Sequence, residues 1–187
     1  APGFAETHFR LARVLVRRGA WREAAEHDVS TRDLDGFPLR CPSDLRAAYA
    51  ETVRRHPRAI LIDGQAVFAS KSEHGIVDYA FFHDGQHPNL RGYAALAEAV
   101  LAELAMRRSF GLAESVAPPR IDPVACARQF GMTPARWIEV CDRSRSFFDR
   151  TAYIRFDPTD RLAVSRRYEQ AAERIATGTP AEDSGGE

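Results

Sequence analysis

The first stretch of the chain carries apolar side chains at the three- and four-residue spacing of a helix. Gly19 interrupts this spacing, and a second helical stretch begins at Trp21. The pattern therefore predicts two helices joined by a tight turn within residues 1–32. One hairpin cannot enclose a core, so we expect it to dock on something else. The apolar positions of the first helix are Phe9, Leu11, Ala12, Leu15 and Val16.

The middle of the chain predicts a helix, a strand and another helix. Ser43 is suited to cap a helix that ends near His56-Pro57. The run Ala59-Ile60-Leu61-Ile62-Asp63 is short and apolar, which is typical of a strand buried in a parallel sheet. Apolar side chains return at helical spacing over residues 90–106, on a face suited to packing against that sheet.

The pattern after Pro118-Pro119 predicts a separate helical module over residues 118–176. Three Asp-Pro or Thr-Pro pairs each place a capping side chain before a proline at the first helical position. Residues 177–187 lack periodicity and are predicted to be disordered. The pairs are Asp122-Pro123, Thr133-Pro134 and Asp157-Pro158. The expected core residues are Trp137, Val140, Cys141, Phe147 and Phe148.

Composition excludes several classes of function. The 187 residues are 44% hydrophobic and 28% charged, as in soluble globular proteins. The 26 basic residues balance 26 acidic ones, so we expect no nucleic-acid partner. No apolar run reaches the roughly 20 residues that a membrane span requires. Cys41, Cys126 and Cys141 lack metal-ligand spacing and are expected to be buried thiols.

The segment from Phe82 to Tyr93 carries the clearest chemical signal. It places an aspartate and a histidine three residues apart, follows them with proline and asparagine, and leads into the helix of residues 90–106. This arrangement closely resembles the last block of SGNH (GDSL-type) serine ester hydrolases. The matching residues are Asp84, Gly85, His87, Pro88, Asn89, Gly92 and Tyr93.

The spacing of Asp84 and His87 also has a physical reason. Acyl transfer by a serine requires an imidazole whose Nε2 faces the hydroxyl and whose Nδ1–H is held by a carboxylate. Two residues on one bent loop can meet this requirement. Gly85 supplies the flexibility, and Pro88 prevents the helix from starting too early.

The resemblance implies an α/β fold, in which residues 33–110 form the C-terminal part of a flavodoxin-like α/β/α sandwich. Residues 1–32 resemble a tetratricopeptide hairpin that precedes this sandwich. The implied activity is hydrolysis of an acyl or acetyl ester, with His87 as the general base and Asp84 as its orienting partner. The expected partner is a small-molecule or carbohydrate ester, and no cofactor is implied.

The chain departs from the family in one important respect. The family takes its nucleophile from a Gly-Asp-Ser block and an oxyanion donor from a Gly-x-Asn-Asp block, but neither occurs here, and Asn89 is the only asparagine. One interpretation is that the chain is a fragment of a longer protein whose upstream part carries these blocks. The start at Ala1 without a methionine favours this interpretation. The other is an inactive homologue that binds a protein partner through the hairpin of residues 1–32.

Two other interpretations of the segment remain. Asp84 could simply cap the loop, with His87 a polar residue at the start of the helix. Alternatively, His83, Asp84 and His87 could ligate a metal, since all three lie within five positions. The metal interpretation would require a helix that points both rings the same way. Gly85 and Pro88 disfavour such a helix, so we expect no metal site.

Overall fold

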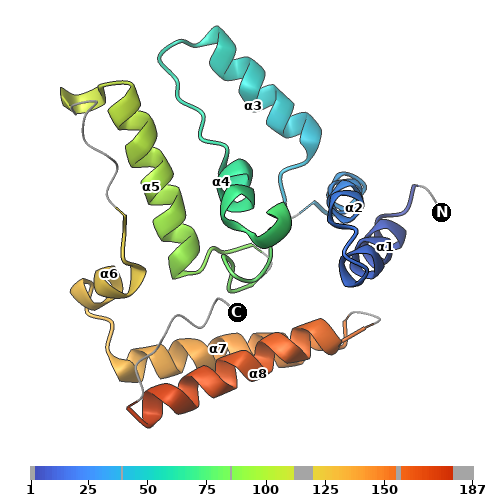
Figure 1. Ribbon diagram of the computed structural model, residues 1–187, viewed down its shortest axis with the longest axis vertical. Helices are drawn as coiled ribbons and strands as arrows, with labels where there is room; N and C mark the ends of the chain where they lie inside the picture. The colour runs from blue at the N-terminus through green and yellow to red at the C-terminus, as the bar shows by residue number, and fades with distance from the viewer. Residues whose placement is uncertain (1–2, 39, 85, 112–119, 155–156, 179–187) are drawn as a thin grey trace. The chain divides into compact units, whose positions relative to one another are not determined.

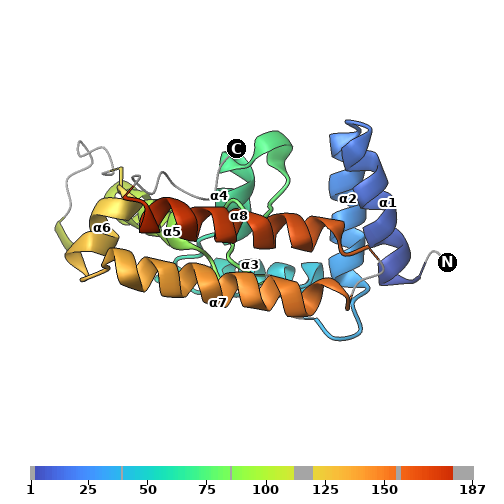
Figure 2. The ribbon, with the colours of Figure 1, turned by 90° about the horizontal axis from the view of Figure 1, so that it is seen from below.

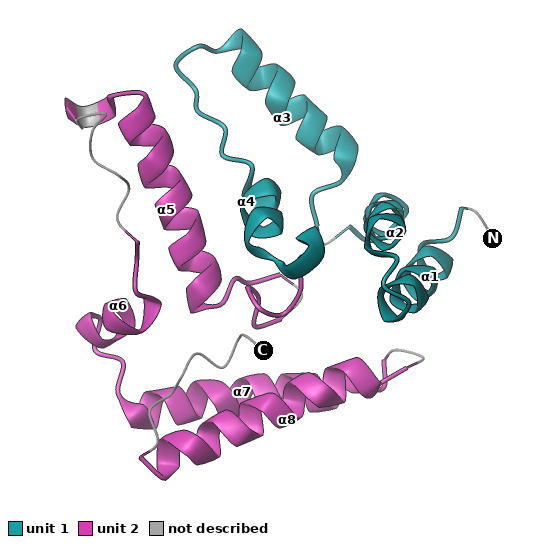
Figure 3. Cartoon of the chain, in the orientation of Figure 1, with its two compact units in different colours: residues 1–77 teal, residues 78–187 magenta. Residues whose placement is uncertain are grey.

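The computed structural model describes residues 3–38, 40–84, 86–111, 120–154 and 157–178 (Figure 1). The chain divides into two compact units (Figure 3). The first unit is Ala1–Val77 and the second is Asp78–Glu187. The first contains α1 (Ala5–Arg17), α2 (Trp21–Asp33), α3 (Ser43–Arg55), α4 (Gly64–Lys71) and the 3-10 turn η1 (Glu73–Gly75). The second contains α5 (Leu90–Met106), η2 (Ser109–Gly111), α6 (Pro123–Gln129), α7 (Pro134–Ala152) and α8 (Thr159–Ala176).

Helices α1 and α2 form the hairpin that the sequence predicts. Ala12 and Ala24 are fully buried, which lets the two helices approach closely. Gly19 has a φ of 73°, a conformation that glycine adopts without strain. Across the hairpin, His8 Nδ1 lies 2.7 Å from His27 Nδ1.

The hairpin docks on the rest of the first unit, as expected for a single helical pair. Trp21 stacks on His74, with ring centroids 3.9 Å apart and planes inclined by 9°. Arg32 donates from Nη1 to Gln65 Oε1 at 2.8 Å and from Nη2 to Ser43 Oγ at 2.6 Å. Ser43, predicted to cap α3, is instead the first residue of that helix, and its hydroxyl accepts from Arg32.

The predicted strand at Ala59–Asp63 does not form. These residues have no regular secondary structure, and Leu61 is 42% exposed. A strand needs a neighbour for its backbone N–H and C=O groups, and no strand occurs within the described residues. Asp63 instead accepts a hydrogen bond from Ala66 N at 3.1 Å and caps α4, a helix that the sequence reading missed.

The expected α/β sandwich is therefore wrong. The described residues are helical apart from turns, irregular segments and one isolated β-bridge between Phe82 and Pro88. Helix α5 has the predicted bounds, but in place of a sheet it contacts α6 and η2. Tyr93 and Met106 on α5 are 57% and 65% exposed, respectively.

The core of the second unit lies between α7 and α8, which run side by side in both views (Figures 1 and 2). Phe148 on α7 is only 1% exposed. Its ring meets Tyr79 edge-on at 5.2 Å, meets Phe147 edge-on at 5.3 Å, and stacks on Tyr168 of α8 at 5.9 Å. Aromatic packing therefore joins both helices to the segment that precedes α5.

Two of the three proline-linked helix starts are confirmed. Asp122 accepts from Val124 N and Ala125 N, and Thr133 accepts from Arg136 N. At the third, Pro158 occupies the cap position of α8, and Asp157 Oδ1 accepts from Thr159 N at 3.0 Å. Pro118-Pro119 and most of the predicted disordered tail, residues 179–187, lie outside the described residues.

The cysteines are free and differ in exposure. Cys141 is buried, Cys126 is half-buried and Cys41 is exposed, so the expectation of buried thiols is wrong for Cys41. Among the helices of the described residues, none combines the length and the apolar character that crossing a bilayer would require.

Candidate functional site

The segment that holds Asp84 and His87 folds back on itself as a short hairpin ahead of α5. The isolated bridge pairs Phe82 with Pro88 in antiparallel fashion. His83 N donates to His87 O at 3.1 Å, and Asn89 N donates to Phe81 O at 2.8 Å. The backbone on either side of Asp84 is thereby fixed by hydrogen bonds that do not depend on its side chain.

Asn89 joins this hairpin to α5. Its side-chain Oδ1 accepts from Gly92 N at 3.0 Å and caps the helix, while Nδ2 donates to Ala80 O at 2.9 Å. Gly92 is buried where the hairpin crosses the first turn of α5. A Cβ at this position would lie 2.8 Å from Pro88 Cβ and closer still to Phe81 O. The glycine is therefore required by close packing.

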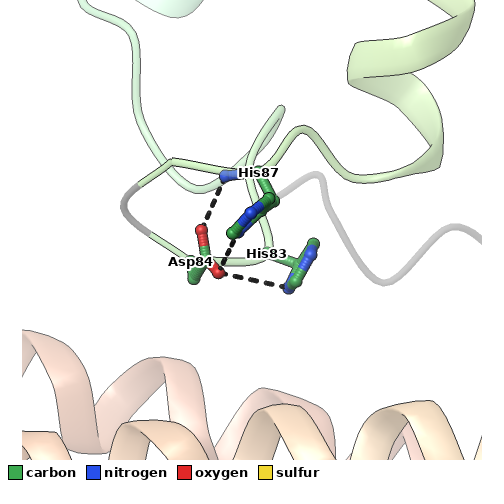
Figure 4. A group of neighbouring side chains, drawn as sticks. All are labelled: His83, Asp84 and His87. Carbon is green, nitrogen blue, oxygen red and sulfur yellow. Dashed lines mark hydrogen bonds and ion pairs between the residues drawn. The ribbon is translucent and has the colours of Figure 1, made fainter. Parts of the chain in front are cut away.

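Asp84 uses its two carboxylate oxygens for different purposes (Figure 4). Oδ1 accepts from Gln86 N and His87 N, each at 2.7 Å, which holds the loop in its turn. Oδ2 lies 2.7 Å from His87 Nδ1. Asp84 therefore caps the loop, as one interpretation of the sequence holds, and also lies against the imidazole of His87.

Asp84 is well placed to remain ionised. Burial raises the pKa of this carboxyl group, but hydrogen bonds from the backbone and ring of His87 and from the backbone of Gln86 outweigh burial. The pKa of Asp84 is consequently lowered. A carboxylate that stays charged can accept the Nδ1–H of His87 and can stabilise that ring when it is protonated.

Exposure separates the two residues of this pair. The Asp84 side chain is 17% exposed, whereas that of His87 is 61% exposed. The carboxylate is therefore shielded, and the ring that it orients remains accessible to a reacting partner. Gly85, to which the sequence assigned the bend of the loop, lies outside the described residues.

His83 joins the same group. Its Nδ1 lies 4.0 Å from Asp84 Oδ2, and its ring stacks with that of His87 at a centroid distance of 5.7 Å. The bond from His83 N to His87 O places these two residues opposite each other in the hairpin. Both rings therefore turn towards Asp84 without the helix that the sequence reasoning required.

Tyr168 on α8 interacts electrostatically with Asp84, and no sequence pattern predicts this. Burial raises its pKa to about 12, and the charge of Asp84 contributes in the same direction. Nothing in the spacing of α8 connects this tyrosine with a loop some eighty residues earlier. The connection depends on tertiary packing through Phe148.

The hairpin of residues 1–32, which is the surface of the protein-binding alternative, has two aromatic side chains that are engaged within the first unit. Trp21 stacks on His74, and the Phe9 ring has the Arg13 guanidinium 5.6 Å from its centroid. Both aromatic side chains are half-buried. They are therefore better explained as parts of the hairpin than as a free binding surface.

Comparison of the chain with protein-family models, with curated proteins and with solved structures finds no match.

Proposed function

We propose that Asp84 and His87 are the carboxylate and general base of an ester hydrolase whose serine nucleophile lies outside this chain. The observation that supports this is the 2.7 Å separation of Asp84 Oδ2 and His87 Nδ1. A carboxylate in this position selects the imidazole tautomer that carries its proton on Nδ1. The Nε2 lone pair is then available to accept a proton from a hydroxyl.

The proposed reaction proceeds in two steps. The serine Oγ attacks the ester carbonyl carbon while His87 Nε2 takes the hydroxyl proton, and the alcohol leaves with that proton. Water then attacks the acyl-enzyme, His87 again takes and returns a proton, and the acid and the free serine are released. Asp84 keeps its charge throughout and stabilises the imidazolium. The proposed substrate is a small-molecule or carbohydrate ester.

The test uses the natural polypeptide that contains this chain, with p-nitrophenyl acetate as the substrate. His87→Ala should lower kcat/KM by roughly three orders of magnitude or more, and Asp84→Asn should also lower it strongly. His56→Ala is a matched control, because His56 is an exposed histidine at the end of α3.

Two results would contradict the proposal. The first is near-normal turnover in His87→Ala. The second is a natural polypeptide that lacks a Gly-Asp-Ser block, since the 187 residues contain none. That second result would favour the inactive homologue over the fragment.

A further inference from the structure

We propose that His83, Asp84 and His87 form a binding site for a divalent transition metal of the zinc class. One ligand atom from each residue lies within 4.8 Å of the other two. This inference does not depend on the proposed hydrolase activity. It rests on the convergence of three side chains that the hairpin brings together (Figure 4).

The distances are close to those that a bound ion would impose. Zinc bonds to histidine nitrogen and carboxylate oxygen are about 2.0–2.2 Å long, so ligand atoms around a tetrahedral ion lie about 3.3 Å apart. Asp84 Oδ2 lies 2.7 Å from His87 Nδ1 and 4.0 Å from His83 Nδ1. Of these two separations, one must lengthen and the other must shorten, each by less than about 1 Å. The third separation, between the ligand atoms of His83 and His87, lies within 4.8 Å and must shorten by up to about 1.5 Å.

The hairpin supplies the preorganisation that such a site needs. The bond from His83 N to His87 O and the bridge between Phe82 and Pro88 fix the backbone beneath both rings. The Asp84 Oδ1 atom is occupied by two backbone N–H groups, which orients the carboxylate so that Oδ2 faces the imidazoles. Side-chain rotation alone can therefore complete the site.

The donor set indicates the class of metal. Two imidazoles and one carboxylate suit zinc, cobalt and nickel, whereas calcium and magnesium prefer shells made of oxygen alone. The side chains of His83 and His87 are 42% and 61% exposed. Water can therefore complete the coordination shell, as it does where a zinc ion has three protein ligands.

Metal binding and hydrogen bonding compete for the same atoms. His87 Nδ1 cannot ligate a metal and donate its proton to Asp84 Oδ2 at the same time. A bound ion would therefore replace the hydrogen bond between Asp84 and His87. If the two residues also serve ester hydrolysis, zinc inhibits that activity.

The experiment is calorimetric titration of Zn²⁺ into the full chain at about pH 7.5, where the ligands can release their protons. We expect one site per chain, and we expect His83→Ala, Asp84→Asn and His87→Ala each to weaken binding by about tenfold or more. His56→Ala and Cys41→Ser are controls for an exposed histidine and for the exposed thiol outside the site, and both should bind as the unchanged chain does.

Three results would overturn the proposal: the absence of binding to the unchanged chain, unchanged affinity in His83→Ala or Asp84→Asn, or loss of binding in Cys41→Ser. Helical circular dichroism identifies any variant that fails to fold, and His83→Gln then replaces it as a milder change. A second readout is the imidazole nitrogen NMR spectrum, in which Zn²⁺ should shift Nδ1 of both His83 and His87. Failure of this site leaves the hydrolase proposal untouched, because that proposal is tested by turnover.

Discussion

Replacing Gly92 with alanine is the sharpest test of how the hairpin is attached to α5. The new Cβ would lie 2.8 Å from Pro88 Cβ and even closer to Phe81 O. Phe81 O is a backbone atom that accepts the hydrogen bond from Asn89 N at 2.8 Å, so it cannot rotate aside. The hairpin must therefore move away from the helix, and that hydrogen bond must lengthen or break.

The free-energy cost of Gly92→Ala follows from two opposing contributions. Overpacking costs about 1–3 kcal/mol, and the rigid backbone atom places this case near the upper end. Alanine is the better helix former and recovers about 1 kcal/mol. We therefore expect a net cost of about 2 kcal/mol for keeping the hairpin closed, which is roughly a thirtyfold change in the opening equilibrium.

Hydrogen exchange of the Asn89 amide measures this opening directly. In Gly92→Ala the amide should exchange roughly thirty times faster than in the unchanged chain. Gly36→Ala is the matched control, because a Cβ at Gly36 meets nothing within 4 Å. An exchange rate in Gly92→Ala that is equal to or slower than that of the unchanged chain would refute the proposed close packing.

Three further predictions concern the scaffold. Phe148→Ala should lower the free energy of unfolding, measured by urea denaturation, by about 3–5 kcal/mol. Phe130→Ala removes an 88% exposed ring and should change this free energy little, so equal effects would contradict the assigned core. The Asp33 carboxyl should titrate by NMR with a pKa of about 2, chiefly because Arg32 donates a hydrogen bond to it. The contribution of this carboxylate to folding stability should therefore be present above the ordinary pKa of 3.8 and lost as the pH falls towards 2. An ordinary pKa for Asp33 would refute this bond. Asp122→Ala, which removes the cap of α6, should lower the free energy of unfolding in urea by about 1 kcal/mol, and Asp122→Asn should lower it little. Equal losses in the two variants would argue against a capping role.

The sequence predicts those helices whose apolar spacing and turn residues lie within the segment itself. Helix α5 has the predicted bounds because its apolar spacing is a local feature, although its cap by Asn89 was not predicted. The hairpin of α1 and α2 follows from apolar spacing and from Gly19 for the same reason. Helix α4 was missed because its eight residues are too few to show a clear period.

The strand and the full site depend on information that is not local. Ala59–Asp63 has the composition of a buried strand, but a strand exists only beside a partner, and the segment itself cannot reveal whether one is present. The pairing of Asp84 with His87 was predictable from spacing and resemblance. The inward turn of His83 was not, because it results from a hairpin whose closing bonds join residues on both sides of the turn.

The side chain of Asn89 stabilises both the start of α5 and the segment that precedes it. The oxygen of its amide group starts a helix, and the nitrogen of the same group holds the preceding chain at Ala80. An ionised aspartate, which can only accept hydrogen bonds, could begin the helix but would no longer hold the preceding chain at Ala80. Helix initiation and loop ordering are thus coupled through one planar group, and a sequence comparison that scores only capping ability would rate such exchanges as harmless.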